Sequence, residues 1–389
     1  MINYLIIYFI LFIISFCLIT YNIRKYNIKQ YLLWLLSKIQ GISNIKYITD
    51  INMIEIESIL QSTTKGKFIE YHIAMPAWYP IISLESCDND LWKEVKSNFL
   101  IFIQYLENRN NHKNTLKYII KNNLNGIIEH ACKSNDKIDS IAISKLVCKS
   151  ICEYLFDYLI SESELNIIYI GSLEWKKEIS CKGIGNTINK WNAINTILSI
   201  IVKNTDVYNI FSNQWNDPEY FSVIMQPFII SPMINISDIM CNAEILLNNK
   251  QINIIDNIIN KDIINKIIYS YHPFPILERY NTTTDTQYFI PLDTLINSNN
   301  YSKLTSMLVF GSGPRKCSGI KYAYDILEPL LADYFQNYKL YEPSKNHKYS
   351  GRINDNVFYL NQLMYMGYIF CKVILITIWL RIIKHIKLF

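Results

Sequence analysis

The sequence lacks the features that mark several common classes of binding protein. Its nine cysteines include no C-x-x-C pair, which excludes the spacing of a zinc ribbon and of a dithiol redox site. The lysines are scattered and the net charge is only +5, so there is no basic stripe for a nucleic acid. No segment of about 20 to 50 residues repeats, which excludes a solenoid. Only 18% of the 389 residues are charged and 50% are hydrophobic, so the chain can bury a large core.

The cysteines are also poor candidates for a disulfide framework. Their number is odd and their spacing irregular. Reduced thiols in a cytosolic compartment are the simplest interpretation, with most of the cysteines acting as small buried hydrophobes.

The N-terminal segment is long, apolar and uncharged. Residues 2–21 contain no charged side chain, and Arg24, Lys25 and Lys29 follow. About 20 apolar residues at ~1.5 Å each span the ~30 Å hydrocarbon core, and the basic residues after them place the body of the protein in the cytosol. A cleaved signal peptide usually has a basic start and a small-residue cleavage site, which are absent here. We therefore predict an anchor over residues 1–22, followed by a linker and membrane-proximal helix over residues 23–49.

The C-terminal segment, residues 364–389, is apolar but interrupted by basic residues. Lys372 lies inside the apolar run, and Arg381, Lys384 and Lys387 punctuate its end. A second transmembrane helix, a basic helix lying in the membrane interface, and a buried last helix all fit this pattern.

The hydrophobic pattern of the middle of the chain changes near residue 271. Residues 30–270 place apolar side chains at three- and four-residue spacing, which predicts helices. Residues 271–310 contain short extended stretches between turns, and residues 318–336 return to the helical period, with Pro329 inside. The pattern predicts a mainly α fold with small β-sheets.

The segment "FGSGPRKCSG", residues 310–319, stands out in this glycine-poor chain. It places Cys317 at the start of a helix, where the helix dipole and nearby Arg315 stabilise a thiolate. Its glycines let the backbone turn sharply and approach a flat ligand closely. One thiolate suffices as the axial ligand of haem iron, because the porphyrin supplies four other ligands. The alternative is a tight turn with a structural cysteine.

The same segment resembles the haem-ligand signature of cytochrome P450, F-x-x-G-x-R-x-C-x-G. Its five fixed positions correspond to Phe310, Gly313, Arg315, Cys317 and Gly319. The resemblance implies that these residues bind haem b and that Cys317 is the axial thiolate ligand of the iron.

Two further segments resemble family motifs that contact the haem propionates. "LWKEVK" is similar to W-x-x-x-R, with Trp92 and Lys96 in the contacting positions, although a lysine at a surface position is the alternative. Lysine keeps the charge of arginine but loses its two-pronged hydrogen bonding. "YHPFPILER" is similar to P-P-x-P-x-x-x-R, which implies that Arg279 meets the second propionate.

The resemblance also implies a catalytic pair on a long helix near residues 190–214. "WNDPEYF", residues 215–221, is similar to the segment that follows the oxygen-binding helix of the family. The nearest match to that helix's A/G-G-x-D/E-T motif makes Thr205 the proton-relay alcohol and Asn204 the replacement for its acid. An amide cannot titrate, so proton delivery would depend on water. The alternative is that Thr205 is an ordinary helix residue.

Part of the family pattern is missing. The E-x-x-R motif falls at Lys266 to Tyr269, where neither the Glu nor the Arg is present, and most of the meander before Phe310 is absent. In the family these segments form one charged network. Because its members are lost together, no buried charge is left without a partner, which would cost about 3–5 kcal/mol. We expect a P450-like haem domain over residues 50–350, truncated in the meander. Lys266 and Tyr269 should lie beneath the loop that carries Cys317, residues 310–319, and residues 295–309 should run directly to that loop. Haem should be held less tightly than in the family.

The function implied by the resemblance is that of a membrane-anchored haem-thiolate monooxygenase. Such an enzyme oxidises a lipophilic small molecule, sterol or fatty-acid-like, with O2 and electrons from NADPH–cytochrome P450 reductase or an equivalent donor. It would lie at the endoplasmic reticulum or another internal membrane, with a single span and a cytosolic body. The alternative is a degenerate relative without monooxygenase activity, either a peroxide-rearranging enzyme or a membrane-tethered haem-binding or interaction protein.

Overall fold

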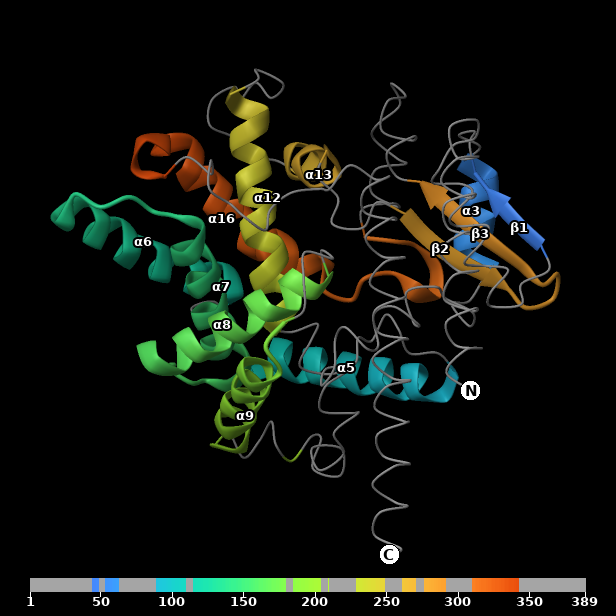
Figure 1. Cartoon of the computed structure of the whole chain (residues 1–389), viewed down its shortest axis with the longest axis horizontal. Coiled ribbons are helices and arrows are strands. Elements are labelled where there is room, and N and C mark those ends of the chain that lie inside the picture. Colours follow the sequence, from blue (N-terminus) through green and yellow to red (C-terminus); the bar gives the residue numbers. More distant parts are fainter. Residues whose placement is uncertain are drawn as a thin grey trace, which may run out of the picture.

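The structure is a computed structural model, and it describes residues 44–48, 53–62, 89–109, 115–179, 185–203, 209, 229–248, 261–270, 276–291 and 310–342. Within these ranges the chain is mainly helical with one small sheet (Figure 1), which confirms the predicted fold class. The segments predicted to meet the membrane, 1–22 and 364–389, lie outside the described residues. In the part that is described, no helix combines the length and the apolar character needed to cross a bilayer.

The helices keep the labels of Figure 1. They are α3 Met53–Ser62, α5 Asn89–Arg109, α6 Leu116–Ser134, α7 Ser140–Phe156, α8 Glu162–Ile179, α9 Thr187–Lys203, α12 Ser231–Asn248, α13 Lys261–Ser270 and α16 Ile320–Gln336, with short 3-10 turns η5 Gly313–Arg315 and η6 Tyr338–Leu340.

Side-chain caps explain where several helices begin. Thr115 accepts a hydrogen bond from the Tyr118 amide at the start of α6, and Asp139 accepts one from the Ala142 amide at the start of α7. Such caps satisfy backbone N–H groups that have no partner within the helix. The α6 and α7 helices therefore begin where the sequence supplies an oxygen acceptor.

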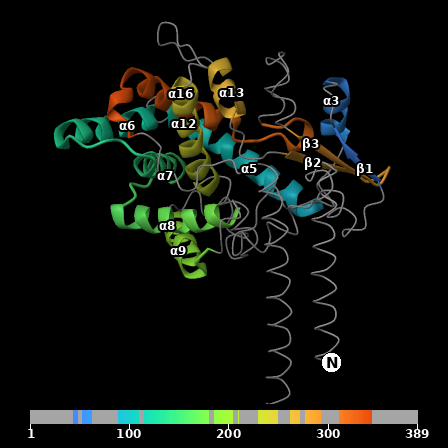
Figure 2. The same cartoon turned by 45° about the horizontal axis from the view of Figure 1, so that its top comes forward.

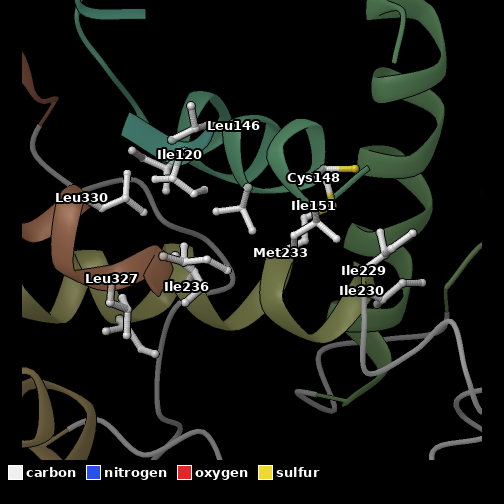
Figure 3. Packing of buried hydrophobic residues seen from close by; sticks show 14 of the residues in the cluster. Ile120, Leu146, Cys148, Ile151, Ile229, Ile230, Met233, Ile236, Leu327 and Leu330 are labelled. Carbon is white, nitrogen blue, oxygen red and sulfur yellow. The ribbon is translucent and has the colours of Figure 1, made fainter. Parts of the chain in front are cut away.

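Four helices enclose the main hydrophobic core. The α12 helix packs across α7 and α16, and α6 packs against both α7 and α16. Figure 3 shows the apolar side chains that these helices bring together. Those that the figure labels on the four helices are Ile120, Leu146, Cys148, Ile151, Met233, Ile236, Leu327 and Leu330. Their burial at helical spacing explains why isoleucine and leucine recur every three or four residues.

The sheet has three strands in the order β1-β3-β2. The central strand β3, Thr286–Pro291, pairs antiparallel with β2, Ile276–Asn281, and parallel with β1, Asn44–Tyr47. The extended character predicted beyond residue 271 is confirmed by β2 and β3. The prediction of a linker and helix over 23–49 is corrected at its end, because residues 44–47 form β1. Its four residues are too few to show a period, and its partner strand is remote in sequence.

Figures 1 and 2 both show the sheet and α3 on one side of the helical body. In both views α5 extends from that body toward the sheet. The Cys loop, residues 310–319, precedes α16 and contacts α3, and the other end of α16 lies in the helical body. The fold thus places this loop where helices and sheet meet.

Candidate functional site

Hydrogen bonds within the Cys loop close it on itself. The Cys317 amide donates to the carbonyl oxygen of Phe310 at 2.7 Å, which joins the two ends of the loop. Gly311 and Gly313 have φ angles of 73° and 66°, the left-handed region that favours glycine. The η5 turn begins at Gly313 and ends at Arg315, two residues before the cysteine. The loop is therefore a compact structure rather than an extended connection.

Cys317 lies beside the N-terminus of α16. Gly319 is the N-cap of this helix, and the Cys317 sulfur lies 3.8 Å from the place where Gly319 would carry a β-carbon. The Cys317 side chain is exposed, whereas Arg315 on the same loop is buried. The positive end of the helix dipole favours negative charge at this position. The structure thus places the Cys317 sulfur beside the start of α16.

Helix α3 supports the loop from one side. A β-carbon added to Gly313 would clash with the carbonyl oxygen of Leu60, near the end of α3. The side-chain amide of Gln61 donates to the Ser312 hydroxyl at 3.3 Å. No sequence pattern indicates this contact, because Gln61 and Ser312 lie 251 residues apart. Glycine at position 313 is required both by its φ angle and by the closeness of α3.

Helix α5 contacts the loop and the helix that follows it. Lys96 donates a hydrogen bond to the carbonyl oxygen of Pro314. Further along α5, Glu107 pairs with Lys321 of α16 at 2.8 Å. The structure therefore places Lys96, expected at a haem propionate, against the Cys loop itself. Trp92 lies on the same helix, but its side chain is outside the described part of the chain.

Strand β2 brings Arg279 to the same loop. Its side chain is 2% exposed, and its terminal nitrogen Nη2 lies 3.9 Å from the place where Gly311 would carry a β-carbon. A guanidinium buried to this extent requires compensating polar partners. The structure thus brings together Arg279, Lys96 and Cys317, three of the residues singled out from the sequence.

The donor set around the loop suits a haem better than a bare metal ion. It offers one thiol, and two cationic side chains reach the same loop from α5 and β2. Haem needs one axial protein ligand and carries two carboxylates that cations can bind. Across the described residues no group of three or more His, Cys, Asp or Glu side chains could hold a metal ion. The residues present therefore fit the implied cofactor.

The expected catalytic pair is not described. Helix α9 ends at Lys203, and Asn204 and Thr205 lie outside the described residues. The α9 helix packs along α8, whereas α12 packs across α16, the helix that follows the Cys loop. This packing makes α12 a second candidate for the long helix beside a bound haem.

One pair of site residues was missed by the sequence analysis. The Tyr324 hydroxyl on α16 donates to the side-chain oxygen of Asn265 on α13 at 2.5 Å. Burial raises the pKa of Tyr324, so its hydroxyl remains a protonated donor at neutral pH. The residues of α13 that the sequence predicts beneath the Cys loop are Lys266 and Tyr269. The Lys266 side chain is exposed, and the Tyr269 side chain lies outside the described part of the chain. No sequence pattern links Asn265 to Tyr324, which are 59 residues apart.

Comparison with known proteins gives a distant structural likeness. No family model matches the sequence, and no curated protein is significantly similar to it. A six-coordinated cytochrome P450 from Thermus thermophilus is 12% identical, with 75% of this chain and 84% of that chain covered at a TM-score of 0.49. A second P450 from another strain of that organism is 12% identical, with 80% and 89% covered at a TM-score of 0.45. At these values the likeness does not by itself establish a family.

Proposed function

We propose that the chain is a haem-thiolate protein of the cytochrome P450 type, with Cys317 as the axial ligand of haem b. The observation that carries this proposal is the Cys loop. Its five fixed positions match the family signature, the loop is closed by its own hydrogen bonds, and the sulfur lies beside the start of α16.

The residues around the loop would hold the haem by its charged edge. Arg279 and Lys96 would bind the two propionates. To do so, the Lys96 ammonium would give up its hydrogen bond to the Pro314 carbonyl and bind a propionate carboxylate instead. The positive φ angles at Gly311 and Gly313 shape the loop that carries the sulfur. When bound, a haem with a thiolate ligand supplies oxygen activation, because the thiolate favours cleavage of the O–O bond. The protein's part is to orient a substrate and to exclude water.

The finer function rests on the family resemblance. We propose monooxygenation of a lipophilic small molecule, sterol or fatty-acid-like, with electrons from NADPH–cytochrome P450 reductase or an equivalent donor. Thr205 would hold the proton to be delivered, and Asn204 would orient the water that supplies it. Replacing Thr205 with Ala should lower product formation more than it lowers haem binding, and an equal effect on both would contradict this role.

We also propose that the protein is held at an internal membrane by residues 2–21. The support is the uncharged apolar sequence followed by basic residues. Deleting residues 2–21 should release the protein from membranes washed with carbonate. Full retention of the shortened protein would contradict this anchor and point to residues 364–389.

Alkylation with and without haem tests the cysteine assignment. Cys132 and Cys317 are both exposed, whereas Cys148 and Cys152 are buried. Iodoacetamide should label Cys132 and Cys317 in the haem-free protein, and added haem should protect Cys317 alone. Peptide mass spectrometry distinguishes the sites, and Cys132 is the internal control. Equal labelling of Cys317 with and without stoichiometric haem would contradict ligation.

A further inference from the structure

A short series of contacts links α13 to the backbone of Cys317. The first is the 2.5 Å hydrogen bond from the Tyr324 hydroxyl to Asn265. Next, the Tyr324 ring packs against the ring of Phe310, with centroids 5.6 Å apart at an angle of 52°. Finally, the Phe310 carbonyl accepts the 2.7 Å hydrogen bond from the Cys317 amide. Two residues, Tyr324 and Phe310, thus connect Asn265 of α13 to the cysteine.

The geometry leaves Tyr324 little freedom. Its hydroxyl is held by Asn265, whose side chain is largely buried. Its ring lies against Phe310, and the Lys261 ammonium lies 5.3 Å from the ring centroid. A tilted aromatic pair and a cation over a ring are both favourable arrangements. Movement of Tyr324 would therefore disturb α13 and the Cys loop together.

The location of these contacts bears on the missing charged network. Asn265 immediately precedes Lys266, where the E-x-x-R motif would begin. Asn265, Tyr324 and Phe310 carry no charge, so the contacts among them require no buried counterion. A satisfied neutral hydrogen bond can join two helices without the desolvation penalty of an ion pair. The chain thus has a neutral connection from α13 to the loop.

We propose that Asn265 and Tyr324 are positioning residues for Cys317, and that they replace the missing charged network by fixing Phe310. This inference rests on the proposed haem-thiolate function. Phe310 carries the carbonyl that receives the Cys317 amide, so its position sets the direction of the cysteine backbone. Loss of this support lets the sulfur move away from the iron or take up a proton, which converts the thiolate complex to a thiol complex.

Two substitutions separate the hydroxyl from the ring. Tyr324→Phe removes the hydrogen bond to Asn265 and keeps the packing on Phe310, whereas Tyr324→Leu removes both. Tyr341→Phe is the control, because the Tyr341 hydroxyl donates a 2.6 Å hydrogen bond to the Asp333 carboxylate in the last turn of α16, at the end of the helix away from the Cys loop. The control also loses one hydrogen bond donated by a tyrosine hydroxyl, and it does so without touching the Cys loop.

The main measurement is the ratio of thiolate to thiol complex in the reduced, carbon monoxide-bound holoprotein. Tyr324→Phe should lower this ratio about fivefold, the equivalent of one hydrogen bond. Tyr324→Leu should lower it about tenfold or more, because the aromatic contact is lost as well. Tyr341→Phe should leave the ratio unchanged even where it lowers thermal stability. An unchanged ratio of thiolate to thiol complex in both Tyr324 variants would overturn the proposal. If Tyr324→Leu does not fold, an unchanged ratio in Tyr324→Phe alone would overturn it.

Hydrogen exchange of the haem-free chain separates this proposal from the proposed function. Peptides that cover residues 310–319 should exchange faster in Tyr324→Phe than in Tyr341→Phe or the unaltered protein. If the unaltered protein forms no thiolate complex, the proposed function fails, and faster exchange would still support the positioning of the loop. Equal exchange in all three proteins would overturn the positioning role whatever the haem result.

Discussion

Gly313 and Leu60 lie so close together that only a residue without a β-carbon fits between the Cys loop and α3. A β-carbon on Gly313 would clash with the Leu60 carbonyl oxygen and would lie 3.0 Å from the Cα atom of Gln61. These obstacles are backbone atoms and cannot rotate away. The contact therefore ties the shape of the cysteine loop to the position of a helix that lies far earlier in the sequence.

Gly313→Ala should destabilise the protein and weaken haem binding. The positive φ angle alone costs a non-glycine residue about 1–3 kcal/mol, and the clash with Leu60 adds to this. Urea denaturation and haem titration measure the two effects. Gly126→Ala in α6 is the control, since an added β-carbon there meets nothing within 4 Å, and it should be neutral or stabilising. A Gly313→Ala protein as stable as the unaltered one would refute the close packing.

A buried ion pair joins α8 to α12. Lys176 and Asp238 lie 2.5 Å apart, with side chains 7% and 14% exposed. Lys176→Met should lower the free energy of unfolding by about 3–5 kcal/mol, because it leaves Asp238 charged and buried. The double variant Lys176→Met/Asp238→Leu should be more stable than Lys176→Met alone, since neither charge remains. Urea denaturation tests this, and a double variant less stable than Lys176→Met would contradict the cost assigned to the unpaired Asp238 charge.

Glu164 should make stability depend on pH in the acid range. Burial raises the pKa of Glu164, but hydrogen bonds from Ser161 and Tyr158 and the charge of Lys203 lower it by more, so the net pKa is below the ordinary value. Because the folded-state pKa is depressed, the stabilisation is complete above the unfolded-state value and is lost as pH falls through the folded-state value.

The comparison of unaltered protein with Glu164→Gln measures this contribution. The difference in unfolding free energy should be constant above about pH 5 and should shrink as the pH falls below about 4. In a Tyr158→Phe background the change should be smaller, because Tyr158 no longer donates to the carboxylate. Parallel pH curves for the unaltered protein and the Glu164→Gln variant, down to the lowest pH at which both fold, would contradict the depressed pKa.

The features that could be predicted from the sequence depend on local spacing. Helical periodicity indicated α5 to α9 and α16, and the loop motif singled out Cys317 beside the start of a helix. Contacts between distant segments could not be predicted in the same way. Strand β1 forms only by pairing with β3, and the Asn265–Tyr324 bond depends on how α13 crosses α16. Neither leaves a periodic pattern in the chain.

Lys96 illustrates the limit for side chains in the site. The motif around it predicted a cation near the haem, and α5 does bring it to the Cys loop. Its present partner, the Pro314 carbonyl, could not be foreseen because backbone acceptors carry no sequence signal. The type of residue at the site was thus more predictable than its partner.

The carbon monoxide difference spectrum of the reduced protein tests the central claim most directly. The unaltered protein and the Cys132→Ala control should both show the long-wavelength Soret band of a thiolate-ligated complex. Cys317→Ala should lose this band, because it removes the only thiol that the loop provides. Stoichiometric haem binding with an unchanged thiolate band in Cys317→Ala would contradict the assignment of Cys317 as the ligand of the iron.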